Sequence, residues 1–174
     1  MNAHKRIFLI GHPGAGKALV AKSLAEKLGW KFIDADLGLE SRIGATTQDI
    51  LGQGEKDFHQ CQYEILMEIC KKDNVVVTTD ASIVCSEKLR DLLTSEFTVY
   101  LQVSALVQIE RTSHQAEFLL PGSDRKRFFE KLHHERDGLY QKISTMQVDS
   151  DNSALDDHVS SIMKFISEDE VKKK

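Results

Sequence analysis

Proline and tryptophan are scarce in this sequence, and long apolar runs are absent from it. The 174 residues include only two prolines, Pro13 and Pro121, and one tryptophan. No stretch approaches the roughly 18 apolar residues that a membrane span needs. The first apolar stretch, residues 7–10, is also too short for a signal peptide. The sequence therefore predicts a chain without a membrane partner, and both prolines fall where we expect loops.

Zinc-type cysteine patterns and an excess of positive charge are missing as well. The three cysteines, Cys61, Cys70 and Cys85, are odd in number and match no zinc spacing. We expect them to be plain thiols, buried or half-buried, in a reducing compartment such as the cytoplasm. The net charge of −4 argues against a nucleic-acid partner, because duplex-binding proteins are usually basic. A small anionic ligand held at a local site is not excluded.

Short apolar runs alternate with longer helical patterns along the whole chain. Strands are expected at residues 6–10, 30–33, 75–79, 97–103 and 146–148. Helices are expected at residues 18–28, 39–51, 55–72, 86–93, 105–111, 124–142 and 155–166, with a polar loop at 114–123. This alternation predicts an α/β fold with a parallel sheet and helices on both faces.

The clearest motif is Gly-His-Pro-Gly-Ala-Gly-Lys at residues 11–17, between the first strand and the first helix. Gly-x4-Gly-Lys in this context is typical of a Walker A loop, or P-loop. Backbone N–H groups of Gly11, Gly14, Ala15 and Gly16 can line an anion-binding nest above the helix N-terminus. Lys17 adds a full positive charge within reach of the outer phosphates. The motif predicts a bound nucleotide, with ATP as the cofactor.

The residue after the lysine departs from the motif. A P-loop normally has Ser or Thr there, whose hydroxyl binds Mg²⁺, but this chain has Ala18. A methyl group cannot bind a metal, so Mg²⁺ binding is doubtful. No set of metal ligands is predicted elsewhere, because His133 and His134 are adjacent on a helix and do not share a face. His12, inside the motif, is interpreted as loop filler.

Taken in order, the motifs resemble those of shikimate kinase from about residue 5 to residue 166. After the P-loop come Phe-Ile-Asp-Ala-Asp at 32–36, Gly-Glu-x-x-Phe at 54–58 and the apolar strand at 75–79. Arg111, Leu-Leu at 119–120 and Arg-x-x-Leu-Tyr at 136–140 follow. The resemblance implies a three-layer P-loop fold of the nucleoside-monophosphate-kinase type with a five-stranded parallel sheet. It also implies transfer of the γ-phosphate of ATP to the 3-hydroxyl of shikimate.

The resemblance also implies a domain organisation. A single P-loop kinase-like domain is expected over residues 1–168. Within it, a substrate-binding helical region covers about 34–62 and a mobile lid covers about 112–124. Residues 169–174 are expected to form a charged, frayed tail.

Site roles follow from the resemblance position by position. Lys17 matches the phosphate-binding lysine, and Arg111 matches an arginine beside adenine. Asp34 matches a carboxylate near the metal. Asp36 matches the carboxylate that binds the shikimate hydroxyls and acts as a candidate base. Arg136 matches an arginine that clamps the shikimate carboxylate, which suits a planar bidentate donor.

Several positions of the resemblance do not match. A second arginine of the carboxylate clamp is replaced by His59, and a glutamate three residues later by Gln62. Asp80-Ala81-Ser82 stands where the family has three glycines. This puts Asp80 in the substrate region with a side chain and a negative charge. In the lid, Glu117 stands in place of an arginine, and the proline of the adenine loop is missing around Leu155.

Three functions remain open on this sequence. The preferred hypothesis is a degenerate shikimate kinase-like protein that binds nucleotide, phosphorylates shikimate weakly or not at all, and serves a regulatory or protein-partner role. The alternative is an active ATP-dependent kinase for shikimate or a related small hydroxylated substrate, supported by Lys17, Asp34, Asp36 and Arg136. A structural subunit without nucleotide is disfavoured by the near-complete P-loop.

Overall fold

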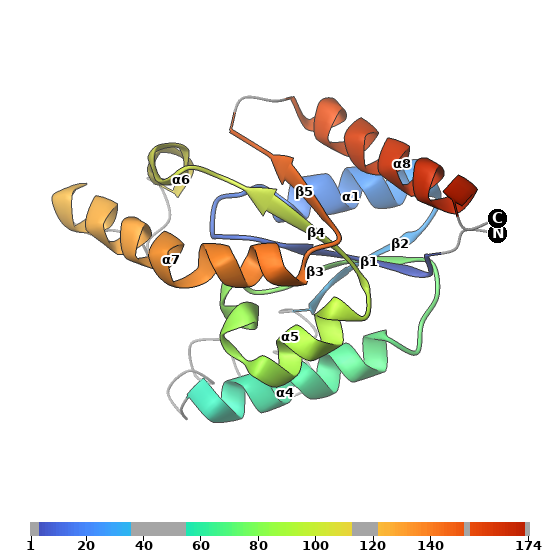
Figure 1. Ribbon diagram of the computed structural model, residues 1–174, viewed down its shortest axis with the longest axis horizontal. Coiled ribbons are helices and arrows are strands. Elements are labelled where there is room, and N and C mark those ends of the chain that lie inside the picture. The colour runs from blue at the N-terminus through green and yellow to red at the C-terminus, as the bar shows by residue number, and fades with distance from the viewer. Residues whose placement is uncertain (1–3, 36–54, 113–121, 152–153, 173–174) are drawn as a thin grey trace.

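A five-stranded parallel sheet forms the centre of the molecule (Figure 1). The computed structural model describes residues 4–35, 55–112, 122–151 and 154–172. The strands are β1 (Arg6–Ile10), β2 (Lys31–Asp34), β3 (Val75–Thr78), β4 (Phe97–Gln102) and β5 (Met146–Asp149). Their order is β2-β3-β1-β4-β5, and every neighbouring pair is parallel. The predicted α/β class with a parallel sheet is confirmed.

Helices cover both faces of this sheet. They are α1 (Lys17–Leu28), α4 (Glu55–Ile69), the 3₁₀ helix η1 (Ala81–Cys85), α5 (Glu87–Thr94), α6 (Ala105–Thr112), α7 (Gly122–Ile143) and α8 (Leu155–Lys172). Figure 1 shows α1 and α8 on one face and α4, α5 and α7 on the other. The three-layer arrangement expected of the nucleoside-monophosphate-kinase type is therefore present.

Strand β1 is the most enclosed element of the sheet. It pairs with β3 on one edge and β4 on the other. Ile7 and Leu9 pack toward α1 and α8, whereas Phe8 and Ile10 pack toward the opposite helical layer. All four side chains are 0% exposed. A strand buried on both faces must be apolar at every position. This explains why polar and apolar residues do not alternate along β1.

Some element boundaries differ from those predicted. Residues 81–85, which had no predicted element, form η1, and the Asp80 carboxylate accepts a hydrogen bond from the Ser82 backbone N–H at its start. Helix α7 begins at Gly122, so residues predicted as loop up to 123 belong partly to the helix. The predicted helix at 39–51 and most of the predicted lid at 112–124 lie outside the described residues.

The predicted frayed tail from residue 169 is wrong for its first part, because α8 continues to Lys172. Asp169 on this helix lies 2.8 Å from His4, measured between Oδ2 and Nε2. Ile166, one turn earlier, is buried against the sheet. These contacts extend the helix into a segment whose sequence is charged throughout. The expectation of buried thiols also fails at Cys85, which is exposed.

Within the described residues, no helix is both long enough and apolar enough to cross a membrane.

Where β1 ends, the backbone of Gly11 lies against β4. A Cβ atom at Gly11 would lie 2.6 Å from the carbonyl oxygen of Leu101, and Gly11 has φ +149°. Both features require glycine, since the neighbouring atom is backbone and cannot move aside. Gly138, in the middle of α7, offers a contrast, because a Cβ there would meet nothing within 4 Å.

We predict opposite stability changes at these two glycines. Gly11→Ala should lower the free energy of unfolding by about 2 kcal/mol or more, because it adds a clash and a strained φ. Gly138→Ala should raise it by about 0.5–1 kcal/mol, because alanine is the better helix former. Urea denaturation of both variants measures the difference. Unchanged stability of Gly11→Ala would contradict the close approach to β4.

Candidate functional site

The loop between β1 and α1 is ordered around the Lys17 side chain. Gly14 and Gly16 have φ of 79° and 86°, in the left-handed region that glycine adopts without strain. The Lys17 ammonium donates hydrogen bonds to the carbonyl oxygens of Gly11 (2.8 Å) and His12 (3.0 Å). Helix α1 has no acidic residue in its first turn. The positive end of the helix and the ammonium therefore act together, which suits an anionic ligand.

A pocket of about 220 Å³ lies beside this loop. Arg111 of α6 forms part of its wall and donates hydrogen bonds to the carbonyl oxygens of Ser150 (2.6 Å) and Gly14 (3.2 Å). A guanidinium fixed in this way offers a planar face to an aromatic ring. The pocket is otherwise mostly apolar and is lined by Ala15, Gly16, Leu19, Val20, Arg111, Leu155 and His158. A largely apolar pocket with a guanidinium in its wall therefore lies next to the loop.

Ala18 is the second residue of α1, and its methyl group is exposed. At this position a hydroxyl would face an ion held against bound phosphates. The methyl group has no lone pair, so the loop supplies no side-chain ligand for Mg²⁺ at this point. The residue that departs from the P-loop motif is therefore open to solvent.

Two carboxylates lie at the ends of adjacent strands. Asp34 is the last residue of β2 and pairs in register with Thr78, the last residue of β3. Asp80 follows β3 by two residues. Carboxyl ends of neighbouring parallel strands share one edge of the sheet, which is where α/β proteins bind ligands. Asp36, the predicted base, lies outside the described residues.

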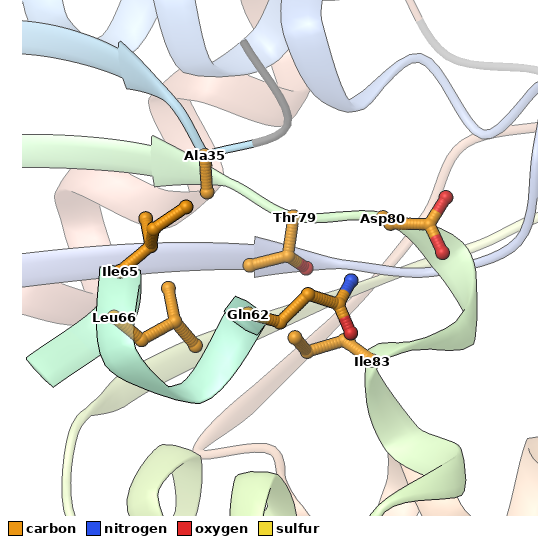
Figure 2. Close-up of a pocket in the computed structure, with 7 residues that line it drawn as sticks. All are labelled: Ala35, Gln62, Ile65, Leu66, Thr79, Asp80 and Ile83. Carbon is orange, nitrogen blue, oxygen red and sulfur yellow. The ribbon is translucent and has the colours of Figure 1, made fainter. Parts of the chain in front are cut away.

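A small cavity lies under these strand ends (Figure 2). Figure 2 shows the Thr79 hydroxyl and the Gln62 amide turned toward each other. Its lining residues are Ala35, Gln62, Ile65, Leu66, Thr79, Asp80 and Ile83. Its volume of about 10 Å³ is about that of a single water position, so it cannot hold a substrate ring.

His59 and Gln62 of α4 form a hydrogen-bonded pair. Nδ1 of His59 lies 2.7 Å from Oε1 of Gln62. Because an amide oxygen only accepts, Nδ1 carries the hydrogen. These two positions are where the resemblance expects an arginine and a glutamate. A hydrogen-bonded imidazole and amide thus stand where the resemblance expects two charged side chains.

Asp80 has a local structural role. Its carboxylate accepts hydrogen bonds from the backbone N–H of Ser82 (2.9 Å) and from the Ser82 hydroxyl, and so caps η1. The buried hydroxyl of Tyr140 donates to the carbonyl oxygen of Ala81 at 2.5 Å, which attaches η1 to α7. Arg136, one turn before Tyr140, is half-buried on the same helix. The segment that replaces the three glycines of the resemblance is therefore a bonded turn next to Arg136.

A cluster that the sequence analysis missed lies behind the P-loop. His12 is 0% exposed, and its Nε2 lies 2.6 Å from Oδ1 of Asp137 on α7. Nδ1 of His133 lies 3.0 Å from each oxygen of that carboxylate. The Tyr100 hydroxyl donates to Oδ1 at 3.1 Å, and Nε2 of His133 lies 3.1 Å from Oε1 of Gln108. His12 is therefore a buried partner of α7 and not loop filler.

Burial and hydrogen bonding set the ionisation of this cluster. Burial lowers the pKa of His12 to about 4, although Asp137 opposes the shift. Burial alone would raise the pKa of Asp137, but hydrogen bonds with His12 and His133 outweigh it and hold that pKa below its usual value. At neutral pH the cluster therefore contains a neutral His12 and a carboxylate.

One sequence signal could have found this cluster. His133 and Asp137 are four residues apart, which places them on one face of a helix. The sequence analysis weighed only the adjacent pair His133 and His134. His12 carried no usable signal, because its partner Asp137 is 125 residues away in the chain.

The structure gathers the predicted nucleotide-side residues but describes only part of the substrate side. Lys17 donates to the Gly11 carbonyl oxygen and Arg111 to that of Gly14, so both side chains are attached to the same loop. Asp34 and Asp80 share a sheet edge, whereas His59 and Arg136 lie on helices of the layer below it. The predicted ligand roles of these residues remain predictions.

Comparison with known proteins agrees with the resemblance noted in the sequence. A family model described as shikimate kinase matches residues 13–167. Shikimate kinase of Francisella tularensis subsp. novicida (strain U112) is 34% identical over 171 residues, covering 96% of this chain and 97% of that one.

Solved structures agree with the family match. A shikimate kinase from Acinetobacter baumannii in complex with shikimate superposes with a TM-score of 0.87 at 26% identity, covering 97% of this chain and 96% of the other. Shikimate kinase from Aquifex aeolicus gives a TM-score of 0.77 at 26% identity, covering 95% and 98%. With a P-loop, an adjoining pocket and these matches over almost its whole length, the chain belongs to the shikimate kinase family.

Proposed function

We propose that this protein is an ATP-dependent kinase that phosphorylates a hydroxyl group of a small hydroxylated substrate, with shikimate as the first candidate. One observation carries the proposal. The P-loop, whose Gly11 and His12 carbonyl oxygens accept hydrogen bonds from the Lys17 ammonium, borders a pocket of about 220 Å³ with Arg111 in its wall. Its relatives are shikimate kinases, which supports the choice of substrate. Free thiols at Cys61, Cys70 and Cys85 suit a cytoplasmic location.

In this proposal the site residues act mainly by binding and positioning. The P-loop amides and Lys17 hold the β- and γ-phosphates, and Arg111 flanks the adenine ring. Arg136 attracts an anionic group of the substrate, and Asp36 orients the hydroxyl that attacks the γ-phosphorus and accepts its proton. Phosphoryl transfer depends mostly on such positioning and on charge stabilisation. We therefore expect Lys17 to contribute more to transition-state stabilisation than any other described residue.

Mg²⁺ supplies charge neutralisation on the phosphates in this chemistry. The P-loop of this chain does not fit the ion well, because the exposed methyl group of Ala18 replaces an oxygen ligand. We therefore infer that any Mg²⁺ would be held by the nucleotide, by water and by Asp34. This arrangement should make ATP binding less dependent on Mg²⁺ than a P-loop with Ser or Thr would.

A second candidate function is nucleotide binding with weak or no phosphoryl transfer, in a regulatory or partner-binding role. The carboxylate of Asp80 and the neutral His59–Gln62 pair favour it, since both disfavour an anionic substrate. The sequence alone placed this candidate first. We now place it second, because family membership supports the kinase and the altered positions leave Lys17 and Arg136 in place.

We predict that ATP stabilises the protein and that shikimate stimulates ADP release. ATP at tenfold above its Kd should raise the Tm by about 3–5 °C. Lys17→Met should abolish this rise and reduce turnover by about 100-fold or more, because it removes a charge from the transferring phosphate. Thermal shift and a coupled ADP-release assay measure the two effects. Lys22→Met is the matched control, since Lys22 is exposed on the same helix.

The outcomes separate the candidates. One outcome is that ATP stabilises the protein but no turnover occurs with shikimate or with related hydroxylated compounds that lack a carboxylate. That outcome would support the second candidate over the first. No stabilisation at millimolar ATP would contradict both candidates and favour a structural protein.

We also predict that Ala18→Thr makes ATP binding more dependent on Mg²⁺. The restored hydroxyl should strengthen Mg·ATP binding by about tenfold over ATP alone, equivalent to about 1.4 kcal/mol. Calorimetric titration with and without Mg²⁺ gives the ratio. Ala18→Val is the control, because valine has the shape of threonine without the hydroxyl. An equal Mg²⁺ response in both variants would show that this position does not face the ion.

A further inference from the structure

The cluster behind the P-loop brings three metal-ligand side chains to one point. His12 comes from the loop, and His133 and Asp137 come from successive turns of α7. One ligand atom from each residue lies within 4.8 Å of the other two. His12 is fully buried, His133 has a side-chain exposure of 18%, and Asp137 has one of 38%, so the cluster opens to solvent on the Asp137 side.

The chemistry of the three groups suits a transition-metal ion. Two imidazoles and one carboxylate form a donor set that binds Zn²⁺ and its neighbours. Neighbouring groups also hold the ligands in place, as the outer shell of a metal site does. The Tyr100 hydroxyl contacts Asp137 at 3.1 Å, and Oε1 of Gln108 contacts Nε2 of His133 at 3.1 Å.

His133 faces oxygen atoms with both of its ring nitrogens. Nε2 lies 3.1 Å from Oε1 of Gln108, and Nδ1 lies 3.0 Å from each oxygen of the Asp137 carboxylate. When the N–H on Nε2 faces Gln108, a metal ion can take the place of a proton between Nδ1 and the carboxylate.

We propose that His12, His133 and Asp137 form a binding site for one divalent transition-metal ion, with Zn²⁺ as the best match. The ligand atoms are Nε2 of His12, Nδ1 of His133 and a carboxylate oxygen of Asp137, and water takes a fourth position on the open side. Ligands of a tetrahedral Zn²⁺ at about 2.1 Å lie about 3.4 Å apart. The His12–Asp137 distance of 2.6 Å must therefore widen by several tenths of an ångström, which the partly exposed Asp137 permits.

The site differs from that of the Mg²⁺ that accompanies ATP. It lies behind the P-loop, on the side of α6 and α7, and uses imidazole ligands that Mg²⁺ does not favour. An ion there would attach the P-loop to α7, the helix that carries Arg136. Its occupancy does not depend on the proposed kinase activity.

Metal titration of tag-free, EDTA-treated protein tests the proposal. Zn²⁺ at about 100-fold above its Kd should raise the Tm by about 5 °C or more. Co²⁺ in its place should give the visible absorption of a four-coordinate nitrogen and oxygen site. His133→Asn and Asp137→Asn should each weaken binding by at least about tenfold, because each removes a ligand. His134→Asn should bind as the wild type does, since His134 is exposed on the adjacent position of the same helix.

Two results would overturn the site. One is the absence of both a Zn²⁺-induced Tm rise and a Co²⁺ spectrum in the wild-type protein. The other is equal metal binding by the wild type, His133→Asn and Asp137→Asn, which would place the ion elsewhere. Either result would leave the three residues as a hydrogen-bonded contact between the P-loop and α7. The Tm of each variant without metal, compared with that of His134→Asn, checks that the variants fold.

Discussion

The enclosure of β1 between β3 and β4 is the constraint on which the functional region depends. β1 pairs with a strand on each edge and is buried on both faces, and these contacts fix its position in the sheet. Its end then meets β4 so closely that Gly11 lies against the Leu101 carbonyl oxygen. The chain must turn there, and it turns into a loop that ends at the N-terminus of α1. The orientation of the anion-binding amides and of Lys17 follows from the packing of this one strand.

Charge is distributed unevenly around the two halves of the site. On the nucleotide side, Lys17, Arg111 and the N-terminus of α1 create positive potential beside a largely apolar pocket. On the substrate side, Asp34 and Asp80 lie at the strand ends, and His59 with Gln62 forms a neutral pair. The two sets of side chains therefore differ in charge, and only their proposed roles connect them with nucleotide and substrate. This difference is why family membership supports a kinase while leaving the natural substrate as a proposal.

Helix α7 connects these two halves. Asp137 contacts His12 in the P-loop, Tyr140 holds η1 through the Ala81 carbonyl, and Arg136 immediately precedes Asp137 in sequence. The residue proposed to attract the substrate is therefore on the same helix as both contacts. Buried polar groups of this kind stabilise a single arrangement when their hydrogen bonds are satisfied, and destabilise it when a partner is lost.

The sequence by itself determined the parallel α/β class, the P-loop and most element boundaries. These features depend on neighbours within a few residues: the apolar run in β1, the helical spacing in α1 and the glycines of the loop. Only the tertiary structure decided that His12 meets Asp137, that Arg111 reaches Ser150 and that Tyr140 bonds to Ala81. Each of these partners is at least 39 positions apart. Strand order and helix packing bring them together, and no local pattern of side chains encodes that order.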